Sequence, residues 1–242
     1  MVATALAILL AGWLIGATGI GGVLVVPVLN QLQGIPVQQA IAAASLAFAL
    51  PGLAAAWRLR SGGTPLPRGA IALTLASVPG AALGALLVHR VSSTGLVAGL
   101  AALALGSGLW GLRGSPHTHE GAALPPLAMG ALGAAVGLGS ALTGTGGPVL
   151  LVPVLMLLRQ PLRTTVPIAQ AIQLPVALCA SAGHAWAGVL DWPLASVLGG
   201  VLLLGALGGQ WAAPRAPAVA LHRLVCGLLV FTGGWTAWRL CQ

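Results

Sequence analysis

The stretch Thr18-Gly-Ile-Gly-Gly-Val-Leu-Val-Val-Pro-Val-Leu29 lies near the start of the chain and returns, little changed, as Thr143-Gly-Thr-Gly-Gly-Pro-Val-Leu-Leu-Val-Pro-Val-Leu155. With one residue inserted, the two lines match almost position for position at an offset of about 125 residues, roughly half of the 242-residue chain. The match continues weakly onward, so that Ser45 aligns with Gln170. This is an internal repeat, and it predicts two duplicated halves that are each interrupted by glycines at the same place.

The composition around the repeat indicates an integral membrane protein. Apolar residues make up 58% of the chain, charged residues only 5%, and the mean hydropathy is +1.01. A soluble domain of this size needs about a quarter of its residues charged to cover its surface. The net charge of +8 comes from arginines scattered between apolar runs, without the basic stripe that nucleic-acid binding needs, so we expect no nucleic-acid partner.

Six apolar runs have the length of ordinary membrane-spanning helices, for which about 20 residues are needed. Two other apolar segments, residues 2–32 and 122–158, are too long for one crossing, and the glycines break each in its middle. The start of the chain lacks the basic region of a cleaved signal, so we read it as mature structure. We expect a first membrane repeat over 1–113, a loop over 114–122 and a second repeat over 123–242. The six expected spans are 38–57, 69–88, 94–112, 165–189, 193–213 and 221–238.

The distribution of arginines indicates whether the broken segments cross the membrane or re-enter on the same side, because cytoplasmic loops are enriched in Arg and Lys. If both segments cross the membrane, the ten arginines divide five against five and indicate no orientation. If both are re-entrant hairpins, eight fall on one side and two on the other. The two are Arg90 and Arg239; the eight are Arg58, Arg60, Arg68, Arg113, Arg159, Arg163, Arg215 and Arg223.

The arginine bias therefore favours two re-entrant hairpins and six spans, with both termini outside the cytoplasm. Three spans in each half make the repeats inverted, so the hairpins enter from opposite faces. Limbs of about 13 residues, roughly 20 Å long, would bring both tips to the centre of the bilayer. The expected fold is thus an all-α polytopic membrane protein built from two inverted repeats. A pair of kinked full spans, with glycines that serve packing only, is the alternative.

The second limb of each hairpin begins just after the glycines and presents a positive helix end with unpaired N–H groups. Two such ends that face each other would hold an anion without a buried arginine, and irregular backbone at this depth marks a cavity. Nearby hydroxyl and amide side chains add donors, although hydrogen bonding between helices would also explain them. The predicted substrate-binding residues are Thr18, Gly19, Gly21, Gly22, Ser45, Thr143, Gly144, Thr145, Gly146, Gly147, Gln170 and Gln173.

The remaining polar residues predict little chemistry. His117, His119 and Glu120 lie in a Pro/Gly-flanked loop, where solvated side chains explain them as well as a metal site does. His184 is a candidate proton relay or an interfacial histidine. We expect no metal, no cofactor and no enzyme activity, because the chain offers no nucleophile with a base, no HExxH and no paired carboxylates.

The pattern around the two breaks resembles the TauE/SafE family of sulfite exporters, also called toluene sulfonate uptake permeases. The resemblance extends over nearly the whole chain and rests on Gly16 to Leu29 and Thr143 to Leu155. It implies transport of sulfite, sulfonates or other small organosulfur anions across the bacterial inner membrane. Val23 and Pro148 stand where the family often has a third glycine, which implies stiffer tips.

Duplicated, interrupted helices are typical of secondary transporters, with the substrate near the midplane at the interface of the repeats. An anion channel-like uniporter and a transporter of another small organic anion remain alternatives. A structural membrane subunit would not require the duplicated polar tips. The anion, the direction of transport and the coupling ion are left open, and Gly-rich faces would allow a homodimer.

Overall fold

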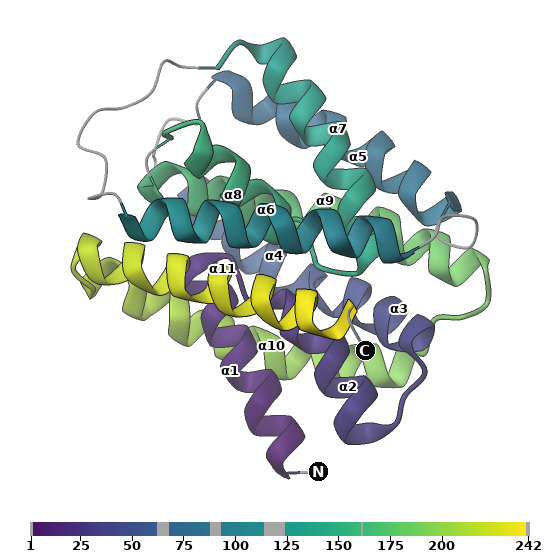
Figure 1. Cartoon of the computed structure of the whole chain (residues 1–242). Helices are drawn as coiled ribbons and strands as arrows, with labels where there is room; N and C mark the ends of the chain where they lie inside the picture. Colours follow the sequence, from purple (N-terminus) through teal and green to yellow (C-terminus); the bar gives the residue numbers. More distant parts are fainter. Residues whose placement is uncertain (1, 62–67, 88–92, 114–123, 161, 241–242) are drawn as a thin grey trace.

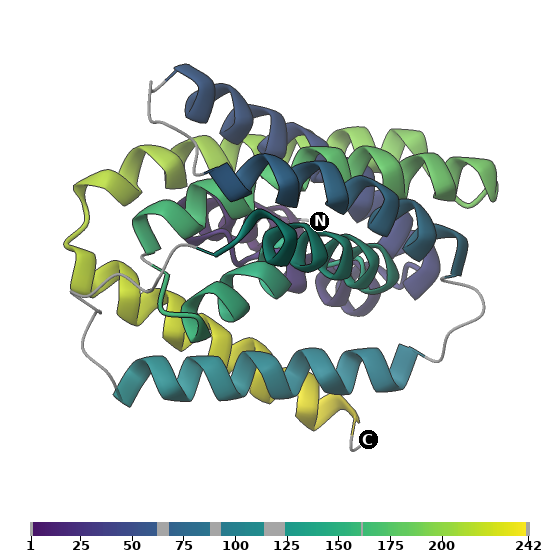
Figure 2. The same ribbon diagram turned by 90° about the horizontal axis from the view of Figure 1, so that it is seen from above.

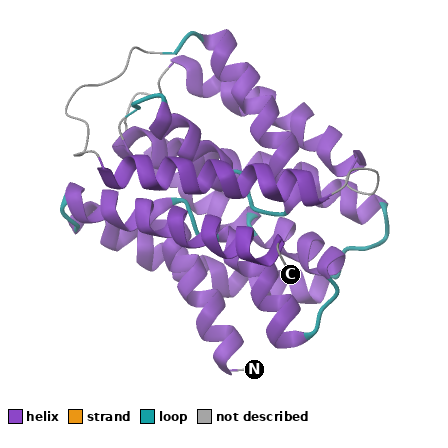
Figure 3. Ribbon diagram, in the orientation of Figure 1, coloured by secondary structure: helices purple, strands orange, loops and turns teal. Residues whose placement is uncertain are grey.

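A computed structural model describes residues 2–61, 68–87, 93–113, 124–160 and 162–240 (Figure 1). Within these ranges every regular element is helical (Figure 3), and five helices are long and apolar enough to cross a membrane. The chain is therefore an all-α polytopic membrane protein. The elements are α1 Val2–Thr18, η1 Gly22–Leu24, α2 Val25–Gln33, α3 Val37–Ala47, α4 Ala49–Ser61, α5 Arg68–Leu87, α6 Ser93–Arg113, α7 Pro126–Thr143, α8 Pro148–Leu157, α9 Leu162–Trp186, α10 Trp192–Ala212, η2 Ala213–Arg215 and α11 Ala218–Leu240.

The first broken segment folds back on itself as a hairpin. The Gln33 amide, at the end of α2, donates a hydrogen bond of 2.6 Å to the Thr4 hydroxyl near the start of α1. A Cβ on Gly21 would run into the Ala11 carbonyl and lie 2.9 Å from the Ile15 nitrogen, so the chain after the break returns against α1. Both ends of this segment thus lie on the same side of its tip.

The limbs of the hairpins are less equal than the sequence predicts. Helices α1 and α7 have 17 and 18 residues, whereas α2 and α8 have 9 and 10. The prediction of about 13 residues for each limb was wrong, because the chain stays helical up to the first glycine of each break. At about 1.5 Å per residue, α7 alone reaches roughly 27 Å, which is long enough to cross the hydrocarbon core.

The span expected over 38–57 is one run of helix with a change at Phe48, where α3 ends and α4 begins. The Phe48 nitrogen donates to the Ala44 carbonyl, and the Phe48 carbonyl accepts from the Gly52 nitrogen, so the chain continues in nearly the same direction. Helices α5, α9 and α10 occupy three further expected spans, and α6 and α11 cover the last two. Asp191 directly precedes α10, and its carboxylate accepts from the Leu194 nitrogen, which is an ordinary helix cap.

The first helix of each half packs against a helix of the other half. In one pair, α1 lies on α10, and a Cβ on Gly12 would lie 2.5 Å from the Leu202 carbonyl oxygen. In the other, α7 lies on α5, and a Cβ on Gly137 would strike the Ser77 carbonyl. Gly137 follows Gly12 by 125 residues, and Ser77 precedes Leu202 by the same 125 residues. The two contacts thus join equivalent positions of the sequence repeat with the two halves exchanged.

Helices α6 and α11 lie side by side and antiparallel (Figures 1 and 2). A Cβ on Gly108 would lie 2.9 Å from the Val230 nitrogen, and one on Gly233, 125 residues later, would lie 2.8 Å from the Leu105 nitrogen. The contact thus repeats with its partners exchanged. A two-fold axis that relates two antiparallel helices must run across them.

Candidate functional site

The two breaks meet in the interior. A Cβ on Gly22, in the first break, would lie 2.6 Å from the Thr145 carbonyl oxygen in the second. A Cβ on Gly19 would lie 3.4 Å from the Cβ of Pro148. Gly22 and Thr145 are both buried. Only a residue without a side chain fits at Gly22, which explains why a glycine is needed there.

The glycines of the second break also supply backbone conformations that other residues rarely adopt. Gly144, Gly146 and Gly147 have φ of 65°, 82° and 87°, all in the left-handed region. In the first break only Gly19 is left-handed, at 78°. The two tips therefore turn differently, although their sequences align.

Each tip places the start of a helix at the point where the breaks meet. Pro148 is the first residue of α8, where its missing N–H removes no helical hydrogen bond. In the first break the chain starts again at Gly22 with one turn of 3₁₀ helix and then enters α2. The first N–H groups of a helix have no acceptor within it, and the positive end of the helix dipole lies with them. Both tips therefore favour negative charge.

The C-terminal ends of α1 and α7 also reach the tips. They would favour positive charge if their carbonyls had no hydrogen-bond donors. In α1 the Gln170 amide nitrogen donates to the carbonyls of Ile15 and Gly16, at 2.6 and 2.8 Å. The Thr18 hydroxyl donates to Leu14 at 2.8 Å. In α7 the Thr143 hydroxyl donates to Gly139 at 2.8 Å. Donors of the protein itself thus occupy carbonyls at both of these negative helix ends.

Five of the predicted site side chains have hydrogen bonds within the protein. The side chains of Thr18, Ser45 and Gln170 are buried and bond to backbone carbonyls, that of Ser45 to Ile41 in its own helix. The Thr143 and Thr145 hydroxyls lie 2.9 Å apart and bond to each other. Their proximity to the tips agrees with the predicted site, and contact with a substrate stays a prediction.

Two buried side chains near the second tip have polar atoms without a hydrogen-bond partner. Gln173 is 1% exposed, and its Oε1 has no partner, while its Nε2 would lie 3.3 Å from a Cβ on Gly146. The Ser140 hydroxyl, also without a partner, would lie 3.9 Å from a Cβ on Gly147. An unpaired buried polar group is costly, and it marks a place where a ligand or water would be stabilising.

Phe48 and Ser140 belong to this region but were missed from the sequence. The Phe48 ring is 1% exposed and would lie 2.9 Å from a Cβ on either Gly22 or Gly146, so it is wedged between the tips. The repeat contains a signal for it, because Phe48 aligns with Gln173 at the same offset of 125. Ser140 aligns with Ile15, and nothing in that pairing would single it out.

The other predicted functional residues lie apart from the tips or outside the described residues. His184 is buried near the end of α9, beside Gly183, which packs on Ala85 of α5. It follows Gln170 by 14 residues along the same helix, or about 21 Å. A role as proton relay therefore stays a prediction. His117, His119 and Glu120 fall outside the described residues.

Residues 4–236 match the family model described as Sulfite exporter TauE/SafE. The match covers nearly the whole chain, including both breaks. No curated protein and no solved structure matches the chain.

Proposed function

The chain belongs to the TauE/SafE sulfite exporter family, a family of membrane transporters, and from this premise we propose the following function. The protein is a secondary transporter that moves a small sulfur-containing anion, such as sulfite or an organosulfonate, across the bacterial inner membrane. The anion binds near the midplane, between the tips of the two broken helices.

One observation carries the location of the site: two interrupted helices from different halves meet tip to tip, with the Gly22 region against the Thr145 carbonyl. Discontinuous helices that meet at the interface of repeats are the usual substrate site of secondary transporters. The Ser140 hydroxyl and the Gln173 amide oxygen, both without a hydrogen-bond partner, belong to side chains that lie beside Gly147 and Gly146. Rotation of that amide by 180° would exchange its donor and acceptor ends. We propose the twelve residues predicted from the sequence, together with Ser140, as the substrate-binding region.

The sign of the substrate's charge follows from which helix ends already have hydrogen-bond partners within the protein. The starts of η1 and α8 face the tips with N–H groups that have no acceptor within their helices. The carbonyls described above at the ends of α1 and α7 accept bonds from Gln170, Thr18 and Thr143. An anion thus finds donors where a cation would find few open acceptors, as at other helix N-termini.

The geometry of α6 and α11 supports the inverted arrangement of the halves. If both helices cross the membrane, the two-fold axis that relates them runs across them and lies in the membrane plane. Repeats related in this way enter from opposite faces, which is the arrangement that alternating access uses. On this topology the ends near Arg58, Arg113 and Arg215 face the cytoplasm.

Flux measurements test the proposed function directly. We expect proteoliposomes that contain the purified protein to exchange radiolabelled sulfite or methanesulfonate faster than protein-free liposomes, and to exchange choline no faster. Counterflow separates the alternatives, because internal unlabelled substrate drives transient accumulation of label through a carrier and not through a channel-like uniporter. Absence of flux for every anion tried would favour a structural subunit.

A further inference from the structure

The Gln170 side chain, in α9, forms its hydrogen bonds with the end of α1 and not with its own helix. Its amide nitrogen donates to the Ile15 and Gly16 carbonyls, which precede it by 155 and 154 residues. A primary amide nitrogen carries two hydrogens, so both are used in these bonds. The side chain is 6% exposed, and its Cγ would lie 3.9 Å from a Cβ on Gly19, at the tip itself.

These bonds matter because α1 ends at Thr18, in the middle of the protein. The last four carbonyls of a helix have no partner within it, and together they act as a partial negative charge. Ile15 and Gly16 belong to this last turn. In a broken helix, the negative end of the first limb and the positive start of the second limb lie at the same tip. If neither end had hydrogen-bond partners, their opposite partial charges would largely cancel.

The second half does not use the same device. Ser45 aligns with Gln170, but its hydroxyl donates to Ile41 in its own helix. At the end of α7, the Ser140 carbonyl accepts from the Gly144 nitrogen, and the Gly139 carbonyl accepts from Thr143. The end of α1 has the same two local bonds, because the Ile15 carbonyl accepts from the Gly19 nitrogen and the Leu14 carbonyl accepts from the Thr18 hydroxyl. Only α1 has a further donor from the opposite half, the Gln170 amide, which bonds to the Ile15 and Gly16 carbonyls.

We propose that Gln170 is a positioning residue that makes the shared tip selective for anions, by neutralising the negative end of α1 from across the repeat interface. This inference rests on the proposed function and gives Gln170 a role other than contact with the substrate. It implies that the first tip is anion-selective only while α9 of the second half is docked against α1. Selectivity for charge would then be a property of the interface between the halves.

The test measures binding of methanesulfonate to purified protein, because this anion stays fully ionised between pH 5 and 8. The variant Gln170→Glu keeps the shape of the side chain and reverses its effect. As a carboxylate it cannot donate to Ile15 and Gly16, and it adds negative charge. Once protonated it recovers one donor. We expect affinity at least tenfold below wild type at pH 8, with partial recovery at pH 5, while wild type changes little with pH.

Two further variants keep the test decisive if Gln170→Glu does not fold. Gln170→Met removes both donors without adding charge, and we expect weaker binding that does not depend on pH. Ser181→Ala is the matched control, because this buried serine of α9 donates only to Ala177 in its own helix. We expect Ser181→Ala to bind as wild type does.

The outcomes separate this inference from the proposed function. Wild-type affinity with a flat pH profile in a folded Gln170→Glu or Gln170→Met overturns the role of Gln170. If Gly147→Val abolishes binding in the same experiment, the tip site still stands. Absence of methanesulfonate binding by the wild-type protein overturns both.

Discussion

At the scale of single residues, the tips depend on glycines, which have no side chain, as much as on the side chains around them. Gly22 gives room to the Thr145 carbonyl, and Gly147 adopts a φ of 87° that few other residues tolerate. Where the first half places the Phe48 ring against the tips, the second half places the Gln173 amide. The region between the tips is therefore polar on one side and aromatic on the other, despite the repeat.

Replacement of Gly147 by valine tests whether backbone N–H groups hold the anion. A β-branched side chain is strained at φ 87° and blocks the approach to the start of α8. We expect flux in proteoliposomes to fall at least tenfold while the protein remains monodisperse. Gly200→Ala in α10, where a Cβ would meet nothing within 4 Å, is the control. Wild-type flux in Gly147→Val would favour kinked helices whose glycines serve packing only.

Removal of the Phe48 ring tests how firmly the tips are packed. A buried phenylalanine replaced by alanine costs about 3–5 kcal/mol in a closely packed core. We expect Phe48→Ala to lower the melting temperature in detergent markedly. The chain has two phenylalanines, and the other, Phe231, is 56% exposed, so Phe231→Ala should change the melting temperature little. Equal effects of both changes would mean that the tips are not packed around the ring.

At the scale of helices, the small residues determine which helices pair. Where α1 meets α10 and α7 meets α5, backbone lies directly against backbone at Gly12, Gly137 and Gly205. Lipid offers no hydrophobic drive for helices to associate, so close packing of this kind holds them together. The ends of α4 and α10 are joined in a different way, because the Arg58 guanidinium donates to the Gln210 carbonyl.

A single methyl group at Gly205 should separate α10 from α1. The added Cβ would strike the Leu9 carbonyl and lie 2.8 Å from the Trp13 nitrogen. Extra atoms in a well-packed interface typically cost about 1–3 kcal/mol. We expect Gly205→Ala to lower the melting temperature in detergent, and Gly200→Ala in the same helix to leave it unchanged or raise it slightly. Equal stability of the two variants would contradict the α1–α10 contact.

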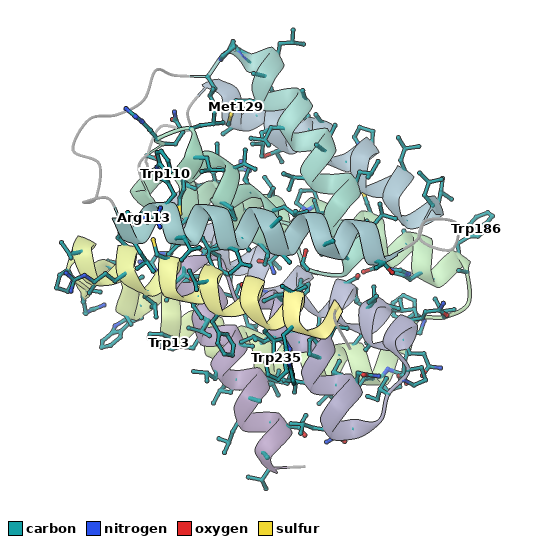
Figure 4. All side chains as sticks on the ribbon, in the orientation of Figure 1. Trp13, Trp110, Arg113, Met129, Trp186 and Trp235 are labelled. Atoms are coloured by element: carbon teal, nitrogen blue, oxygen red, sulfur yellow. The ribbon has the colours of Figure 1, made fainter. Side chains whose placement is uncertain are left out.

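At the scale of the whole molecule, the ends of the helices divide between two sides. Arg113 and Trp186 lie at opposite sides of the molecule (Figure 4). The end of α6 is joined to the start of α11, because His222 lies 2.9 Å from the Gly111 carbonyl. The end of α4 is joined to that of α10 through Arg58. Four helix ends that bear or adjoin arginines are thus in contact in pairs, and the side of the membrane on which they lie stays a prediction.

Labelling of single cysteines in a variant without the native ones tests the orientation. Ser61 is the last residue of α4, whereas Ala187 follows α9, and both are exposed. We expect a membrane-impermeant maleimide added to intact cells to label Ala187→Cys and not Ser61→Cys. Permeabilised cells should label both. Labelling of Ser61→Cys alone in intact cells would contradict the inverted topology.

The sequence by itself determined the membrane class, the internal repeat and the two broken helices. The membrane class and the breaks depend on hydropathy and on glycine and proline, which act over one or two turns of chain, and the repeat is visible as a similarity between two stretches of sequence. Only the tertiary structure decided that Gly22 meets Thr145, that the Phe48 ring lies between the tips and that Gln170 bonds to the end of α1. The physical reason is distance along the chain, because a hydrogen bond between residues 155 apart leaves no local pattern of hydropathy or turn residues.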